Sequence, residues 1–245
     1  MMPPATPANH AAAADLGETA ALVIGASGGI GAALADALTA RGHGVVHRLS
    51  RAHTAGFDLT DPAALHAAID AALAGPPIVT TIIATGLLHA PDHGPEKSLR
   101  ELDADWLHRQ FAINAIGPAL VLAHLLPRLP RDRPVRVATL GARVGSISDN
   151  RLGGWYGYRA SKAALHQIVR TAAIEWRRTH PLALLAALHP GTVATPLSAP
   201  FSRSTAQKPL LEPAQSATHL LDVLDTLQPA QSGRIFDWQG SEIAP

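Results

Sequence analysis

The sequence predicts an α/β fold: a Rossmann-type doubly wound parallel β-sheet with helices on both faces, in a single domain over residues 19–245. Short apolar runs alternate along the chain with longer segments whose apolar residues recur at helical spacing. A chain of 245 residues with 47% hydrophobic content also suffices to bury one large core. Residues 1–18 are rich in proline and alanine and lack a basic start, so we expect a disordered tail rather than a signal peptide.

The composition argues against several kinds of partner. The formal net charge is +1 and no lysine or arginine run occurs, so we expect neither nucleic acid nor an anionic membrane surface as a partner. No apolar run approaches the roughly 20 residues of a membrane span. The 13 histidines are scattered without metal-ligand spacing, and we expect no metal site. The absence of cysteine excludes disulfides and catalytic thiols and fits a reducing compartment, so we expect a cytoplasmic location.

The first strand–turn–helix unit has the form of a phosphate site. Residues 20–24 are an apolar run that predicts a buried strand, and a helix follows that ends at about Gly42. Between them lies the turn GASGGIG, whose glycines let backbone N–H groups approach a pyrophosphate while the helix N-terminus adds its positive dipole end. We therefore expect a dinucleotide at this turn, in contact with Gly25, Ser27, Gly29, Ile30 and Gly31.

The end of the next strand, predicted over residues 44–49, indicates which dinucleotide binds. In dinucleotide folds an acid at this point holds a ribose 2′-hydroxyl, whereas an arginine accommodates a 2′-phosphate. No acid occurs from residue 45 to residue 55, and the strand end carries Arg48, Ser50 and Arg51. We expect NADP(H) to be preferred, with NAD(H) as the alternative cofactor. The other interpretation is that the two arginines only cover the surface.

The middle of the chain continues the alternation. After Phe57-Asp58-Leu59, Asp61 can cap and Pro62 can open a helix that ends at about Leu73. Residues 77–84 predict a buried strand that leads into Thr85-Gly86, and residues 103–126 predict a helix. Its apolar stretch contains Asn114, which is either a structural amide bound to backbone carbonyls or part of a site, because a buried asparagine needs partners.

The last third of the chain supplies the remaining elements. Residues 134–140 predict a strand that we count as the fifth, and residues 182–188 a sixth, followed by the segment HPGTVAT. The segment 196–213 contains proline, serine and phenylalanine and is a candidate substrate lid. A helix over 214–227 and a strand over 234–236 complete the predicted fold.

Tyr158 and Lys162 lie four residues apart on a long predicted helix. Because residues four apart share one face of a helix, a phenol and an ammonium lie side by side there. A neighbouring cation favours the phenolate, so we expect Lys162 to lower the pKa of Tyr158 from its usual value of about 10. Such a pair can serve as a general acid/base near neutral pH. The same spacing also arises by chance on ordinary helices.

With these motifs in this order, the chain resembles the short-chain dehydrogenase/reductase family over about residues 19–240, and the run SDNRLGGWYGYRASKAAL is similar to its C-factor-like branch. The resemblance implies that Tyr158 protonates a carbonyl oxygen as NADPH delivers hydride to the carbon. It implies that Lys162 lowers the pKa of Tyr158 and binds the nicotinamide ribose, and that Asn114 holds a water in a proton relay. The further cofactor contacts it implies are Asp58, Leu59, Ala84, Gly86, Asn114, Tyr158, Lys162, Pro190, Gly191, Val193 and Thr195.

One departure from the family concerns the serine that polarises the carbonyl. This serine usually ends the fifth strand, where strand register points to Gly141 in this chain. Ser146 lies twelve residues before Tyr158, close to the usual separation, and Ser148 is the second candidate. We expect Ser146 to be the catalytic serine if one is retained; otherwise it only satisfies loop backbone groups.

Two functions follow from these observations. One is an NADP-dependent oxidoreductase acting on a small carbonyl or alcohol, and the intact Asn114, Tyr158 and Lys162 favour it. The alternative is a catalytically impaired, cofactor-binding signalling or regulatory protein, which Gly141 favours. An extended nucleotide-sugar epimerase needs more than the about fifty residues that follow Thr195. The resemblance also implies a homodimer or homotetramer, and Leu87, Leu88, Trp155 and Tyr156 indicate an apolar pocket.

Overall fold

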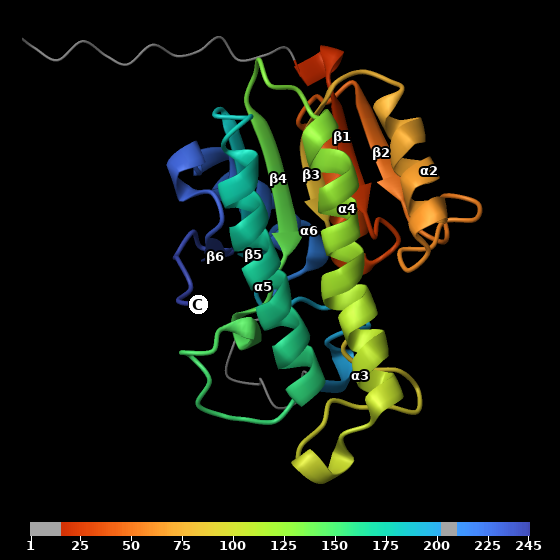
Figure 1. The fold of residues 1–245 in the computed structure, drawn as a ribbon, viewed down its shortest axis with the longest axis vertical. Coiled ribbons are helices and arrows are strands. Elements are labelled where there is room, and N and C mark those ends of the chain that lie inside the picture. Colours follow the sequence, from red (N-terminus) through yellow and green to blue (C-terminus); the bar gives the residue numbers. More distant parts are fainter. Residues whose placement is uncertain (1–15, 202–209) are drawn as a thin grey trace, which may run out of the picture.

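Six parallel strands form one sheet in the order β2-β1-β3-β4-β5-β6 (Figure 1). The structure is a computed structural model that describes residues 16–201 and 210–245. Every strand in it runs parallel to its neighbours, as the apolar runs predicted. The strands are β1 (Ala20–Ile24), β2 (Val45–Leu49), β3 (Ile78–Ile83), β4 (Val135–Leu140), β5 (Ala183–His189) and β6 (Ile235–Asp237).

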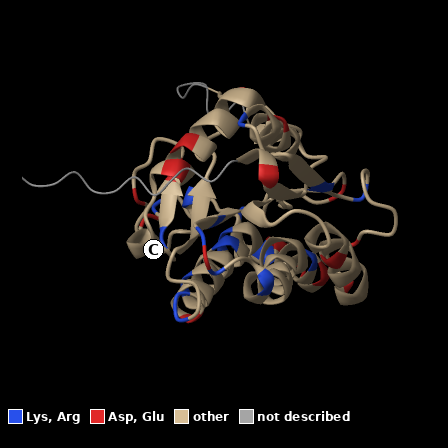
Figure 2. Ribbon diagram, turned by 90° about the horizontal axis from the view of Figure 1, so that it is seen from above, with Lys and Arg blue, Asp and Glu red and all other residues tan. Residues whose placement is uncertain are grey.

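Helices cover both faces of the sheet, so the predicted doubly wound fold is confirmed (Figure 2). Successive residues of a strand point to opposite faces. In β1, Leu22 therefore packs with one set of helices and Val23 with the other. The first set is α2 (Pro62–Leu73), α4 (Gly117–Leu125) and α5 (Tyr156–Trp176); the second is α1 (Gly29–Ala40) and α6 (Pro213–Thr226). Another helix, α3 (Ala104–Phe111), packs against α5.

The strand that was counted as the fifth, β4, is the fourth along the described residues, after β1, β2 and β3. The segment between β2 and α2, which contains residues 57–59, is a loop. Phe57 and Leu59 are nevertheless buried in the core of the α2–α5 face. Their apolar character serves packing rather than sheet formation, and β2 is left as an edge strand.

Part of the predicted N-terminal tail is structured. Residues 1–15 lie outside the described residues, but Leu16–Glu18 form a 3₁₀ turn. The carbonyl of Leu16 accepts hydrogen bonds from the N–H groups of Thr19 and Gly44, both at 3.0 Å. These bonds fix the turn against the start of β2, so the boundary of the expected disorder at residue 18 was placed too late.

The helix predicted over 103–126 is continuous from Ala104 to Arg128, but it contains one π-helical turn, Ala112–Ile116, between α3 and α4. Asn114 lies in this turn. By length and composition the 25-residue helix could cross a membrane, although 50% of its most apolar window is buried inside the protein. Its residues Val121, Leu122 and Leu125 belong to the core beneath the sheet, which accounts for the apolar run.

Candidate active site

The residues expected to carry the chemistry meet where the strands reach their carboxyl ends, in the lower half of Figure 1. Tyr158 and Lys162 come from the first two turns of α5, and Asn114 comes from the π turn. A Cβ built on Gly86, after β3, would lie 3.8 Å from Lys162 Nζ and 3.9 Å from Asn114 Oδ1. The fold thus brings together residues from three segments of the chain that are up to 76 positions apart.

Asn114 joins the β3 loop to α5 and has no exposed surface. Its Oδ1 accepts the N–H of Leu87 at 2.7 Å, while its Nδ2 donates to the carbonyl of Leu87 at 2.8 Å and to Ser161 Oγ at 3.0 Å. The buried amide is therefore satisfied by the backbone and by α5. Such π turns are frequent at functional sites, and here the turn carries a side chain that links two segments of the site.

The electrostatics of Tyr158 and Lys162 correct one expectation. Burial raises the pKa of Tyr158 to about 12 and lowers the pKa of Lys162 to about 8. The Lys162 ammonium donates to the carbonyl of Leu140 at 2.9 Å and lies 5.8 Å from the Tyr158 ring centroid. Because the Lys162 ammonium is hydrogen-bonded to a backbone carbonyl, desolvation of the phenol has a larger effect on the pKa of Tyr158 than the nearby positive charge. Tyr158 is therefore a protonated phenol at neutral pH.

After β4, Ala142 shares a buried apolar cluster with Tyr158, whereas Gly141 faces His166. Ala142, Leu88 and Tyr158 form one buried apolar cluster. Gly141 continues the sheet by donating its N–H to the carbonyl of Leu188 at 2.9 Å, and a Cβ at this position would lie 2.7 Å from His166 Nε2. The backbone changes direction between residues 141 and 142. Strand register therefore pointed to Gly141, whereas the residue that lies beside the phenol is Ala142. That position holds a methyl group instead of a hydroxyl.

Ser146 and Ser148 have hydrogen bonds within their loop and to Pro245, and none to Tyr158 within residues 16–201 and 210–245. Ser146 Oγ donates to the carbonyl of Pro245 at 3.4 Å and accepts the N–H of Asp149 at 3.2 Å. Ser148 donates both its N–H, at 3.1 Å, and its hydroxyl, at 2.5 Å, to the same carbonyl. Both hydroxyls hydrogen-bond to residue 245 and so hold the loop after β4. This agrees with the alternative given for Ser146, that it only satisfies backbone groups of its loop.

The glycine turn forms a cradle that suits a pyrophosphate. The φ angle of Gly25 is +88°, and a Cβ there would lie 2.8 Å from the carbonyl oxygen of Ala84. A Cβ on Gly29 would lie 2.9 Å from Thr195 Cγ2, so the turn lies directly against the HPGTVAT segment. Gly28 caps α1 without a side-chain hydrogen bond, which leaves the first N–H groups of the helix for a ligand. These residues fit a dinucleotide.

At the end of β2, the two arginines have different surroundings. Arg48 forms an ion pair with Asp36 of α1 at 2.7 Å. Arg51 is exposed and has no ion pair within residues 16–201 and 210–245. Ser50 is buried and bonds to His53 Nδ1 at 2.8 Å. Arg51 is therefore the cation best placed to meet an incoming phosphate.

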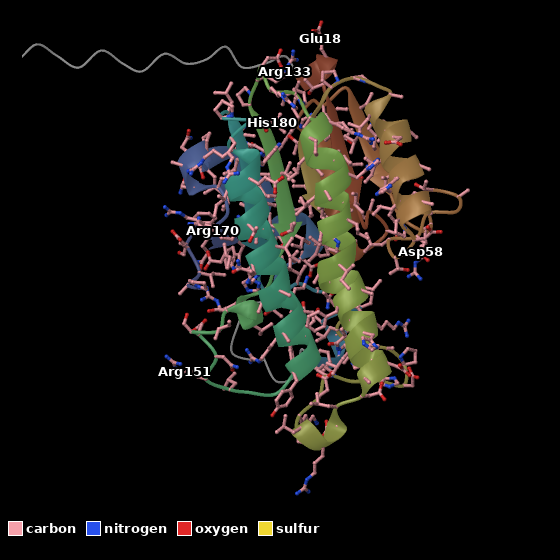
Figure 3. The ribbon with its side chains drawn as sticks, in the orientation of Figure 1. Glu18, Asp58, Arg133, Arg151, Arg170 and His180 are labelled. Carbon is pink, nitrogen blue, oxygen red and sulfur yellow. The ribbon has the colours of Figure 1, made fainter. Side chains whose placement is uncertain are left out.

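Asp58, labelled in Figure 3, lies on the loop that follows and feels the charge of Arg51. Its carboxylate accepts the N–H and the hydroxyl of Thr60, both at 2.8 Å. These hydrogen bonds, with a smaller contribution from the charge of Arg51, hold the pKa of Asp58 below its usual value. Leu59 packs instead into the core, close to Gly117 of α4.

Apolar side chains form a wall around Tyr158. Its buried centre is formed by Leu88, Ala142 and Tyr158. Partly buried side chains pack against this centre: Val144 from the loop after β4, Trp155 from the start of α5, and Leu197 and Phe201 from the candidate lid. Leu88, Trp155 and the lid were expected from the sequence, whereas Val144 was missed. Residues 202–209 of the lid lie outside the described residues.

The fold and this site define a dinucleotide-dependent oxidoreductase. The family model for short chain dehydrogenases matches residues 19–206, so the chain belongs to that family and is an NAD(P)-dependent oxidoreductase. The assembled Tyr158, Lys162 and Asn114 and the oxidoreductase relatives do not favour the alternative of a catalytically impaired regulatory protein.

Among curated proteins, the chain is similar to C-signal of Myxococcus xanthus, with 38% identity over 146 residues, or 60% of this chain and 82% of that protein. It is 36% identical over 140 residues to 1-hydroxy-2-glutathionyl-2-methyl-3-butene dehydrogenase of Rhodococcus sp., an alignment that spans 57% of this chain and 59% of that protein.

Two solved structures share the fold over nearly the whole chain. A putative short-chain dehydrogenase/reductase from Burkholderia multivorans with bound NADP has a TM-score of 0.75 and 25% identity, covering 93% of this chain and 100% of that one. The NADPH-bound carbonyl reductase from chicken fatty liver has a TM-score of 0.79, covers 92% and 94% of the two chains and, at 22% identity, shows the fold alone.

Proposed function

We propose that this protein is an NADP(H)-dependent carbonyl reductase that converts a small aldehyde or ketone into an alcohol. The observation that carries the proposal is the buried, protonated phenol of Tyr158 within an apolar wall, one helical turn from Lys162. Similarity to an NADP-bound relative supports the cofactor. An assay that follows NADPH absorbance with a panel of small aldehydes and ketones tests this function.

The mechanism divides the work between cofactor and chain. The cofactor, when bound, supplies a hydride to the carbonyl carbon. Tyr158 holds the proton that the carbonyl oxygen receives, so hydride and proton together give the alcohol. Lys162, fixed through the carbonyl of Leu140, places a positive charge beside the oxygen that becomes negative. The apolar side chains around Tyr158 exclude water and strengthen these interactions.

The binding residues follow from the same geometry. The turn from Gly25 to Gly31 would hold the pyrophosphate, and the segment from Pro190 to Thr195, which lies against Gly29, would hold the nicotinamide end. At the other end of the cofactor, Arg51 would meet a 2′-phosphate. Arg48 would serve mainly to fix the end of β2 through its ion pair with Asp36.

We expect Arg51→Ala to weaken NADPH binding while leaving NADH binding unchanged. An arginine–phosphate hydrogen bond contributes about 1.5–3 kcal/mol, or roughly tenfold to a hundredfold in affinity. Fluorescence titration with both cofactors measures the effect. Arg133→Ala is a matched control because Arg133 is partly exposed, pairs with its neighbour Asp132 at 3.2 Å and precedes β4, away from Asp58 (Figure 3). Wild-type protein that binds NADH as tightly as NADPH would contradict the proposed preference.

The pH dependence of reduction should reflect Lys162 and not Tyr158. Tyr158, whose pKa burial raises to about 12, stays protonated throughout the usual assay range. Lys162, whose pKa burial lowers to about 8, carries its charge below that pH and loses it above. We expect kcat/KM for reduction to be constant below about pH 7 and to fall about tenfold per pH unit well above the pKa of Lys162. A loss of activity on the acid side, between about pH 6 and 7, would contradict this assignment.

We also propose that the protein forms a homodimer or homotetramer through α4 and α5. These helices lie side by side on one face of the sheet (Figure 1), and exposed isoleucines lie on both segments. Ile116, just before α4, is 52% exposed and Ile174 on α5 is 45% exposed. Burying such side chains against a second copy is favourable. Light scattering at micromolar concentration should give a mass of two or four chains; the mass of one chain would contradict it.

A further inference from the structure

Trp155, three residues before Tyr158, has an unusual backbone conformation. Its φ and ψ are 54° and 44°, in the left-handed region, and it is the N-cap of α5. Within residues 16–201 and 210–245 it is the one non-glycine residue with positive φ, and it follows Gly153 at φ 65° and Gly154 at φ 64°. A bulky residue adopts this conformation at a cost, so the surroundings must hold it in place.

Glu96 supplies the holding contacts. Its backbone carbonyl accepts the N–H of Trp155 at 2.5 Å, and its side-chain Oε2 accepts the N–H of Gly157 at 3.2 Å. Glu96 is only 2% exposed, which is rare for a carboxylate and consistent with a specific role. Glu96 therefore contacts the backbone on both sides of Tyr156, immediately before Tyr158, and its carboxyl group lies at the N-terminus of α5.

The conformation of Trp155 directs its ring into the substrate wall. The ring centroid lies 5.2 Å from that of Phe201 in the lid and 6.3 Å from that of Tyr158, where the interplanar angle is 70°. Leu88, Ala142, Val144 and Leu197 complete the wall. Apart from the hydroxyl of Tyr158 and the indole N–H of Trp155, these side chains are apolar, and the His89 ring lies 5.8 Å from that of Phe201. The rings of Trp155 and Phe201 offer stacking contacts to a flat ring, which an aliphatic chain of similar size cannot make.

We propose that Trp155 determines substrate specificity, selecting carbonyl compounds with a flat aromatic substituent, and that Glu96 is the positioning residue that holds Trp155 and the first turn of α5. The proposal rests on the proposed carbonyl reductase function and adds its substrate class. Trp155 would thus select the substrate without taking part in proton transfer. Glu96 would support the site from outside the group formed by Tyr158, Lys162 and Asn114.

The test of Trp155 compares benzaldehyde with hexanal, each with NADPH, in wild-type protein and in Trp155→Gly and Trp155→Phe. Glycine keeps the left-handed backbone without strain, so the variant removes the ring alone. We expect wild type to prefer benzaldehyde in kcat/KM and Trp155→Gly to lower this preference by about tenfold, the size of one aromatic contact. Trp155→Phe, which keeps a ring, should retain most of the preference.

The outcomes separate this inference from the function on which it rests. A wild-type enzyme that reduces aldehydes but shows the same benzaldehyde-to-hexanal ratio in Trp155→Gly would overturn the specificity role. A wild-type protein that oxidises no NADPH with any carbonyl in a broad panel would instead overturn the proposed function.

The test of Glu96 uses Glu96→Ala and Glu96→Gln. Glutamine keeps an oxygen that accepts the N–H of Gly157, whereas alanine removes it. We expect Glu96→Ala to lower kcat about tenfold with NADPH affinity unchanged, because a displaced Tyr158 misses the carbonyl oxygen, and Glu96→Gln to restore most of kcat. Thermal unfolding of both variants checks that the chain folds. Wild-type kcat in Glu96→Ala, or an equal loss in both variants, would overturn the positioning role.

Discussion

Tyr158→Phe is expected to lower carbonyl reduction by 10²–10⁴-fold, the usual cost of losing general-acid catalysis, with NADPH affinity nearly unchanged. The substitution removes one hydroxyl and keeps the ring that packs against Leu88 and Ala142. The proton source is lost while the apolar wall remains. Steady-state kinetics with the best substrate of the panel, together with an NADPH titration, measure the two effects separately.

Tyr156→Phe is the matched control. Tyr156 is the other of the two tyrosines in the chain and lies two residues earlier, at the start of the same helix. The two variants therefore lose the same group from neighbouring positions on α5. We expect Tyr156→Phe to retain wild-type kcat. Equal losses in both variants, or substantial turnover by Tyr158→Phe, would mean that another residue supplies the proton.

Ala142→Ser is expected to raise kcat, because it places a hydroxyl at the position that packs against Tyr158. Removing a single hydrogen-bond donor to a developing oxyanion from a natural active site lowers kcat by about 10²–10³-fold. A donor introduced without supporting contacts is held less firmly, so we expect a gain of about tenfold. Gly141→Ser should instead impair the protein, because a Cβ at residue 141 would meet His166 Nε2 at 2.7 Å.

Two serine variants control for this prediction. Ser146→Ala and Ser148→Ala remove hydroxyls that bond to the carbonyl of Pro245, and we expect kcat within about threefold of wild type, because loop hydrogen bonds contribute modestly. A hundredfold loss of kcat in Ser146→Ala at unchanged thermal stability would show that Ser146 reaches the substrate carbonyl, and a lack of any gain in Ala142→Ser would then agree with it.

The fold was largely predictable because its signals are local. The apolar runs 20–24, 134–140 and 182–188 are too short for buried helices and became strands of one parallel sheet. Asp61 and Pro62 open α2 as expected, and Asp61 accepts the N–H groups of Ala63 and Ala64. The 134–140 run was wrongly counted as the fifth strand, since only three strands precede it in the described residues.

The site was predictable where the spacing within one element decides it, as for Tyr158 and Lys162 on α5. It was not predictable where the path of a loop decides it. Whether Gly141 or Ala142 lies beside the phenol depends on how the chain turns after β4. Strand register gives the position at which the strand ends but not the direction in which the following side chains point. The pKa of Tyr158 was misjudged for a similar reason, because the helix spacing could not show that Leu140 holds the Lys162 ammonium. The burial of Glu96 could not be predicted from the sequence, because a lone glutamate in a loop is ordinarily solvated.

The most direct test of the account is the oxidation of NADPH by the purified protein in the presence of small aldehydes and ketones. We expect at least one aromatic carbonyl compound to be reduced, with one alcohol formed per NADPH consumed and slower turnover with NADH. Saturable NADPH binding without consumption of NADPH by any compound of the panel would contradict the assignment of Tyr158 as a working general acid, and with it the proposed function.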